Sequence, residues 1–391
     1  MQSINLLLQK KMQEAERAEY DLVVLAPNGL RRGRTTGSCA TAAVKAALVV
    51  LLADEQKEKV EVSLPDGVHY LVVPIQQAKR LSAESVRAEV LKDGGDDPDN
   101  THGATIFAEV CKNDVGEIRF FAGKGVGTAT QPGLRVAVGE PAINPVPRQM
   151  MRRAVAEVLD ELKIAEQGFD LTIGCEDGET IAQKTFNPRL GIVGGISILG
   201  TSGIVEPMSM ASWIASIEVY IRVALAGDAQ SVAYLPGKIG RDFAKNELGL
   251  IEKRSVQIAN FLGDALDFTQ QALEEEQRQL NVLWLAGHPG KLAKVLDGVW
   301  DTHSSKSNMA MGGVARVAAE CGVLPAVVQE MENANTVEAA IDILKTHPVA
   351  QQVWTEIEQR IATLAQQRMP AVKRVEVRLF DLAGNQLGAG A

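Results

Sequence analysis

Alternating apolar and polar positions in the first part of the chain predict a set of short strands. The runs are rich in Val, Ile and Phe and are separated by Gly, Asp and Pro turns. We expect strands over residues 60–64, 69–75, 85–91, 104–112 and 117–122. An Ala-rich segment at about 39–53 is apolar on nearly all sides, which is typical of a buried core helix. Residues 30–150 are therefore expected to form one mixed α+β domain.

Strand-like and helical segments alternate from residue 151 to residue 391. A strand is expected at 169–173 and a long helix at 208–226. The next strands are expected at 231–235, 255–259 and 281–286, with helices at 239–248, 262–277 and 290–299. This alternation predicts a parallel, Rossmann-like sheet. Helices then dominate from about residue 305 to 368, and residues 373–382 alternate like a final edge strand. The fold class is therefore α/β.

A proline-rich segment separates these two regions. Residues 141–147 contain three prolines in seven residues, so the backbone must be extended or turned there. Pro147 is suited to open a helix at 148–162. We expect the domain junction close by, near residue 150. Residues 1–29 form a polar leader to which no chemistry is assigned.

Charge and cysteine content exclude several classes of function. The chain has 40 Lys and Arg against 49 Asp and Glu, a net charge of −9. Because nucleic-acid affinity depends largely on neutralising phosphates, no nucleic-acid partner is expected. The apolar runs are shorter than the roughly 20 residues of a membrane span, and no signal-peptide pattern precedes them. The four cysteines lie far apart, without CxxC or Cys/His spacing, which favours free thiols in a cytoplasm and no metal site.

A basic, hydroxyl-rich turn opens the expected buried helix. Arg34, Thr35, Thr36 and Ser38 precede the apolar segment. A helix N-terminus offers free N–H groups and a partial positive charge, so an anion such as a carboxylate or phosphate fits there. The alternative is simple capping of the helix by Ser38 beside solvated arginines.

Two further loops are candidates for ligand binding. Glycines are dense within the apolar run 191–203, which indicates either tight packing or a ligand site lined by backbone. The acidic loop 93–99 lacks the spacing of a calcium-binding EF-hand loop. We therefore expect that loop to be a turn.

Glycine and polar residues follow three successive expected strands. Gly237 and Gly240 follow the first, Asn260 the second, and His288 and Lys291 the third. In open parallel sheets, ligands bind outside the carboxyl ends of the strands. No ligand-type residue is spaced from His288 or His303 as a zinc site requires, and each histidine is either structural or poised for proton transfer.

Taken together, these segments resemble one protein family. The sequence is similar to the CbiD-type cobalt-precorrin-5B C(1)-methyltransferases of the oxygen-independent cobalamin pathway. The resemblance covers about residues 30–305, and nothing is carried over beyond Ser304. The segments that carry it are 34–40, 101–103, 125–127 with 132–134, 139–148, 184–209, 287–291 and 302–304.

The resemblance implies transfer of a methyl group from S-adenosyl-L-methionine to carbon 1 of cobalt-precorrin-5B, giving cobalt-precorrin-6A. The corrinoid substrate brings its own cobalt, so no protein-bound metal is expected. The carboxylate groups around the edge of this macrocycle require several cations or helix N-termini that face the same ligand. A homo-oligomer and transient contacts with neighbouring pathway enzymes are compatible with this activity, and no membrane partner is expected.

Three groups of residues are assigned to the expected site. The candidates for substrate binding are Arg34, Thr35, Thr36, Ser38, Lys124, Arg148, Arg189 and Lys291. The candidates for binding the methyl donor are Gly194, Gly195, Gly200, Thr201, Gly203, Glu206, Gly237, Gly240 and Asn260. His288 and His303 are the candidates for catalytic proton transfer during ring tautomerisation.

Two other functions stay open at this point. A carrier would bind the corrin intermediate and hand it on without cofactor-dependent turnover. A nicotinamide-dependent oxidoreductase would use the Rossmann-like half, but GxGxxG after a strand, with an acid about 20 residues on, is missing. Titration with each cofactor would separate the three functions.

Overall fold

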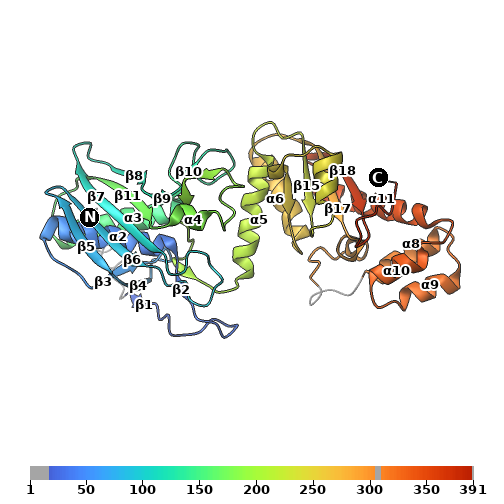
Figure 1. The fold of residues 1–391 in the computed structure, drawn as a ribbon, viewed down its shortest axis with the longest axis horizontal. Coiled ribbons are helices and arrows are strands. Elements are labelled where there is room, and N and C mark those ends of the chain that lie inside the picture. The colour runs from blue at the N-terminus through green and yellow to red at the C-terminus, as the bar shows by residue number, and fades with distance from the viewer. Residues whose placement is uncertain (1–16, 304–309, 390–391) are drawn as a thin grey trace, which may run out of the picture. The chain divides into compact units, whose positions relative to one another are not determined.

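The computed structural model describes residues 17–303 and 310–389 (Figure 1). Contacts between residues divide the chain into two compact units, Met1–Ser209 and Met210–Ala391, called unit 1 and unit 2 below. Each unit has its own hydrophobic core, and each is described by itself.

The main sheet of unit 1 explains why this division falls later than the expected junction near residue 150. Its five strands, in sheet order, are β5 (Gln77–Ser82), β6 (Ser85–Leu91), β7 (Thr105–Asn113), β11 (Gly168–Cys175) and β8 (Ile118–Ala122). β11 is antiparallel to β7 and parallel to β8, with Leu171 opposite both Val110 and Phe120. The strand expected at 169–173 therefore forms, but it completes the first sheet rather than opening the second.

Short strand pairs bring distant parts of unit 1 together. A three-stranded sheet contains β1 (Ala18–Glu19), β4 (His69–Pro74) and β3 (Lys59–Ser63). Three two-stranded sheets join β2 (Gly33–Arg34) to β14 (Ile204–Val205), β9 (Gly125–Val126) to β13 (Gly195–Ile196), and β10 (Thr128–Ala129) to β12 (Ile192–Val193). The glycine-rich stretch thus lies against both the basic turn and the segment after β8.

Helix α2 (Thr36–Ala53) forms the centre of unit 1, as the apolar pattern predicted. It packs against α3 (Pro145–Glu161) and against β6 and β7. By length and composition alone α2 could cross a membrane, but 83% of the apolar window lies buried inside the protein. The burial identifies it as a core helix. A short helix, α4 (Gly178–Ala182), completes the unit.

Unit 2 contains the parallel sheet that the second half of the sequence predicted. The strands, in sheet order, are β16 (Ser255–Gln257), β15 (Ser231–Leu235), β17 (Leu280–Gly287) and β18 (Val372–Leu379), and every neighbouring pair is parallel. The chain passes from β15 to β16 on one side and then to β17 on the other. This reversal makes the β15–β17 boundary the topological switch point, where open α/β sheets bind ligands. β18 lies at the edge, as expected.

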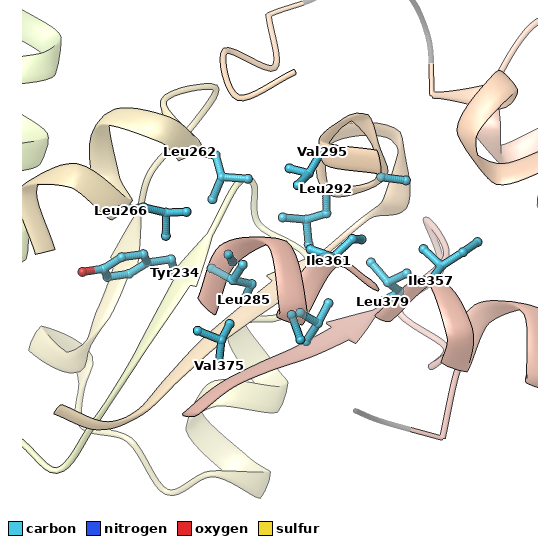
Figure 2. Packing of buried hydrophobic residues seen from close by; sticks show 14 of the residues in the cluster. Tyr234, Leu262, Leu266, Leu285, Leu292, Val295, Ile357, Ile361, Val375 and Leu379 are labelled. Carbon is cyan, nitrogen blue, oxygen red and sulfur yellow. The ribbon is translucent and has the colours of Figure 1, made fainter. Parts of the chain in front are cut away.

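Alternate residues of these strands enter two cores. Val232 and Tyr234 join the larger cluster, whereas Ala233 and Leu235 face Phe243 on the other side of the sheet. Figure 2 shows side chains of β15, β17 and β18 packed with helical residues such as Leu266, Leu292 and Ile361. The helices of unit 2 are α5 (Met210–Leu225), α6 (Leu262–Glu275), α7 (Pro289–Leu292), α8 (Met311–Glu320), α9 (Pro325–Glu332), α10 (Val337–Leu344) and α11 (Ala350–Arg368).

Several elements differ from the sequence predictions, and three of them have a plain physical reason or form. The helix expected at 239–248 is a π-helical turn, Phe243–Glu247, because Gly240 has a φ of +95° that no helix accommodates. The helix expected at 290–299 is α7 followed by a 3₁₀ turn, Ala293–Asp297. β5 was not expected, since its mostly polar, exposed residues give no apolar alternation. Of the predicted leader, residues 1–16 lie outside the described residues.

Candidate functional site

The hydroxyl groups at the start of α2 hold a loop of the protein itself. Thr35 caps α2 by accepting a hydrogen bond from the Ser38 N–H at 3.1 Å, and its hydroxyl donates to the Gly203 carbonyl at 3.3 Å. The Ser38 hydroxyl donates to the same carbonyl. Thr36 accepts from the Leu199 N–H at 2.8 Å. These donors were predicted to face an anion, and in the structure they secure the glycine-rich loop; contact with substrate stays a prediction.

Tight packing accounts for three glycines of that loop. A Cβ on Gly195 would lie 2.0 Å from the Gly125 carbonyl oxygen, and one on Gly200 would lie 2.6 Å from the Thr35 hydroxyl. A Cβ on Gly203 would lie 2.6 Å from a Leu64 methyl group. Gly194 is different, because a Cβ there would meet nothing within 4 Å. Of the two alternatives left open by the sequence, close packing fits most of these positions.

Glu206, the predicted acidic contact to the methyl donor, already has a cationic partner. Its carboxylate accepts from Arg32 Nε at 2.6 Å. The Tyr20 hydroxyl lies 3.5 Å away; burial raises the pKa of Tyr20, although the charge of Arg32 opposes that rise. Thr201, predicted in the same set, is exposed at the loop tip.

A buried ion pair closes the acidic loop after β6. Lys92 is 1% exposed, and its Nζ donates to Asp99 at 2.6 Å. Burial by itself would raise the pKa of the Asp99 carboxyl, but Lys92 and the hydrogen bonds from Thr101 hold it below the ordinary value. The loop is thus an internally bonded turn, as predicted. Throughout residues 17–303 and 310–389, no group of three or more His, Cys, Asp or Glu is placed to hold a metal ion.

The predicted cations of unit 1 serve different neighbours. Arg34 donates to the Val72 carbonyl at 3.2 Å and lies 3.8 Å from Asp93. Arg148 donates to the Ile143 carbonyl at 2.8 Å, which holds the proline-rich segment. The remaining two are surface groups: Lys124 is paired with Glu176 at 2.9 Å, and Arg189 lies over the ring of Phe186 at 5.8 Å.

The carboxyl edge of the unit 2 sheet brings the other predicted residues together. Gly237 and Gly240 follow β15, Asn260 follows β16, and His288 and Lys291 follow β17. Lys291 Nζ donates to the carbonyl of Pro236 at 2.8 Å and approaches that of Ala259 at 3.5 Å. This one ammonium group therefore ties together the segments after all three strands. The predicted donor-binding set is divided between the two units, residues 194–206 in unit 1 and the rest here.

His288 has structural partners on both ring nitrogens. Nδ1 accepts from the Gly290 N–H at 3.0 Å and caps α7, and Nε2 lies 2.9 Å from Glu338. The His303 N–H donates to Asp301 at 3.2 Å. A part in proton transfer stays a prediction for both histidines.

The sequence reading missed one cation at this edge. Lys294 is 5% exposed and donates to the Thr302 carbonyl at 3.1 Å. Its spacing of three residues from Lys291 was the available signal, but spacing alone does not tell a buried lysine from an exposed one.

Comparison with known proteins identifies the family. The model of the CbiD family matches residues 24–207, and that of the CbiD C-terminal domain matches residues 301–391, which extends the resemblance beyond Ser304. A Ralstonia nicotianae protein named cobalt-precorrin-5B C(1)-methyltransferase is 64% identical over 97% of this chain and 98% of its own. A Chromobacterium violaceum protein of the same name is 59% identical over 96% of this chain and 99% of its own.

A crystal structure of a cobalamin biosynthesis protein (CbiD) from Archaeoglobus fulgidus is 28% identical, covers 72% of this chain and 86% of its own, and has a TM-score of 0.39. The two family models together match more than half of the chain, and the relatives match it along almost its whole length. This chain therefore belongs to the CbiD family.

Proposed function

We propose that this chain transfers a methyl group to carbon 1 of cobalt-precorrin-5B and so produces cobalt-precorrin-6A. The observation that carries the proposal is the 64% identity with the Ralstonia nicotianae methyltransferase over 97% of this chain and 98% of that one. The match therefore extends over nearly the whole length of both chains.

We propose S-adenosyl-L-methionine as the methyl donor. The ring carbon supplies the electron pair of the new C–C bond, the bond from methyl to sulfur breaks, and its electrons stay on sulfur. S-adenosylhomocysteine then leaves as a neutral thioether, and the positive charge of the sulfonium passes to the methylated macrocycle. This step needs alignment of carbon, methyl and sulfur rather than a covalent protein nucleophile. Burial raises the pKa of both the Cys39 and Cys175 thiols to about 12, which suits a mechanism without a thiolate.

The test is an anaerobic incubation of the full chain with cobalt-precorrin-5B and S-adenosylmethionine that carries a ¹³C-methyl group. We expect the product mass to rise by one methyl group and the label to appear at ring carbon 1 in the carbon NMR spectrum. The same mixture without the donor is the control. Tight binding of the corrinoid without label transfer would favour a carrier instead, and turnover only with a nicotinamide would favour an oxidoreductase.

Replacing His288 by asparagine tests the predicted proton transfer. Asparagine is also a good helix cap, so we expect the variant to keep its thermal stability and to lose only a few-fold in turnover. General acid–base catalysis is worth about 10²–10⁴-fold. A hundredfold loss of turnover at unchanged melting temperature would instead assign proton transfer to this ring.

We place the reaction in the cytoplasm, which is consistent with four cysteines that are all free thiols. The corrinoid is the proposed small-molecule partner. Light scattering of the purified chain would test the expected homo-oligomer, and pull-down with neighbouring pathway enzymes would test transient contacts.

A further inference from the structure

Lys291 is a half-buried cation with no anionic partner among the residues that the structure describes. Its Nζ has two partners, the carbonyl oxygens of Pro236 and Ala259. An ammonium group has three protons to donate. In the described part of the chain, neither a third acceptor nor a carboxylate lies within bonding distance of Nζ. One N–H group of this partly buried ammonium therefore has no acceptor in the described part of the chain.

A second buried lysine influences the charge of Lys291. Lys294 is 5% exposed. Burial lowers the pKa of Lys291 below its ordinary value, and the charge of Lys294 lowers it further. Buried charges are costly unless they are paired. Within residues 17–303 and 310–389 no carboxylate contacts Lys291 Nζ, so an anion would stabilise this partly buried ammonium group.

Neighbouring groups at the same edge are also free for a ligand. The Asn260 amide, directly after Ala259, has no hydrogen-bond partner among residues 17–303 and 310–389. A Cβ on Gly237, directly after Pro236, would meet nothing within 4 Å, so there is open space beside that backbone. Both residues lie at strand ends next to the switch point between β15 and β17.

We propose that Lys291, with the Asn260 amide as a second donor, binds a carboxylate group at this edge of the unit 2 sheet. The inference rests on the proposed function, which supplies two sources of that group. One is the acidic fringe of the corrinoid substrate, and the other is the α-carboxylate of the methyl donor.

The test compares Lys291→Met with Lys373→Met in the full chain. Lys373 is exposed on β18. The Lys373→Met control therefore removes the same charge as Lys291→Met but leaves the proposed site intact. Calorimetry measures the affinity of each protein for cobalt-precorrin-5B, for S-adenosylhomocysteine, and for 5′-methylthioadenosine, which has no carboxylate. A hydrogen bond to a charged group is worth enough to predict roughly tenfold to hundredfold weaker binding of one carboxylate ligand in Lys291→Met.

The pattern of losses identifies the source of the carboxylate. Weaker binding of S-adenosylhomocysteine with unchanged binding of 5′-methylthioadenosine assigns the site to the methyl donor. Weaker binding of cobalt-precorrin-5B alone assigns it to the substrate. Asn260→Ala should weaken binding of the same ligand by several-fold. Lys373→Met should leave the binding of every ligand unchanged.

Thermal melting distinguishes a binding role from a structural one. Lys291→Met removes a desolvated charge, which is favourable, and also the hydrogen bonds to the carbonyls of Pro236 and Ala259, which is unfavourable, so the melting temperature of the ligand-free variant should change little. Unchanged affinities for both carboxylate ligands, or a loss of affinity that accompanies a lowered melting temperature, would overturn the proposed site. If the wild type still methylates cobalt-precorrin-5B in that case, the proposed function stands, whereas a wild type that binds neither ligand overturns both.

Discussion

Replacing Asp99 with alanine is expected to lower the unfolding free energy of unit 1 by about 3–5 kcal/mol. Lys92, its partner, is 1% exposed and donates to Asp99 at 2.6 Å. Without the carboxylate, the ammonium group would be left buried and uncompensated. Asp99 also accepts from the N–H and the hydroxyl of Thr101, both at 2.7 Å, so the turn loses its anchor as well.

Asp96→Ala is the matched control for this prediction. Asp96 lies in the same loop and pairs with Arg31 at 3.0 Å, but both side chains are well exposed. Surface pairs of this kind contribute little to stability, because water screens the charges and the side chains lose conformational freedom. Equal losses in the two variants would contradict the view that burial makes the Lys92–Asp99 pair important.

The stability of unit 1 must be measured independently of that of unit 2. All four tryptophans, Trp213, Trp284, Trp300 and Trp354, lie in unit 2, so their fluorescence during urea unfolding reports on unit 2 alone. Amide hydrogen exchange of peptides from β6 and β7 reports on unit 1. We expect Asp99→Ala to accelerate exchange in β6 and β7.

The same pair predicts a dependence of stability on acid. The folded pKa of Asp99 lies below its ordinary value, so the contribution of the pair is complete above about pH 4. It is lost as the pH falls through the folded pKa, because protonation then removes the partner of Lys92. The unfolding free energy of unit 1 should therefore fall less steeply with decreasing acidic pH in Asp99→Ala than in the wild type.

Gly195→Ala is expected to destabilise unit 1 by about 3 kcal/mol or more, beyond the usual range for overpacked positions. The added methyl carbon would lie 2.0 Å from the carbonyl oxygen of Gly125 and 2.2 Å from its carbon. Gly178 approaches the same carbonyl oxygen, since a Cβ there would lie 2.1 Å from it. These neighbours are backbone atoms, which cannot rotate away as a flexible side chain can.

The adjacent Gly194→Ala variant is the control. It has a φ of +93° and open space around the Cβ position, so it should lose only the roughly 1–2 kcal/mol of a left-handed backbone. Hydrogen exchange of the β9 and β13 peptides compares the two variants. Equal losses in the two variants would contradict the view that the close approach to Gly125 requires glycine at position 195.

Local pattern was enough to predict most elements. The apolar segment of α2, the strands β3, β4, β6, β7 and β8, and the parallel sheet of unit 2 all form close to where the sequence placed them. Each has a strong apolar period of its own. β5 lies at a sheet edge and is largely exposed, so its residues show no apolar period and the sequence does not predict it.

Sequence by itself determined the family, the element types and the residues that gather at the carboxyl edge of the unit 2 sheet. Tertiary structure decided which strand joins which sheet, so that β11 completes unit 1. It also decided which polar groups are already satisfied: Ser38 is bonded to Gly203, far away in the sequence, whereas Lys291 has a donor without an acceptor in the part of the chain that the structure describes. The physical reason is that hydrogen-bond and charge partners come from residues far apart in the chain, which no local pattern can reveal.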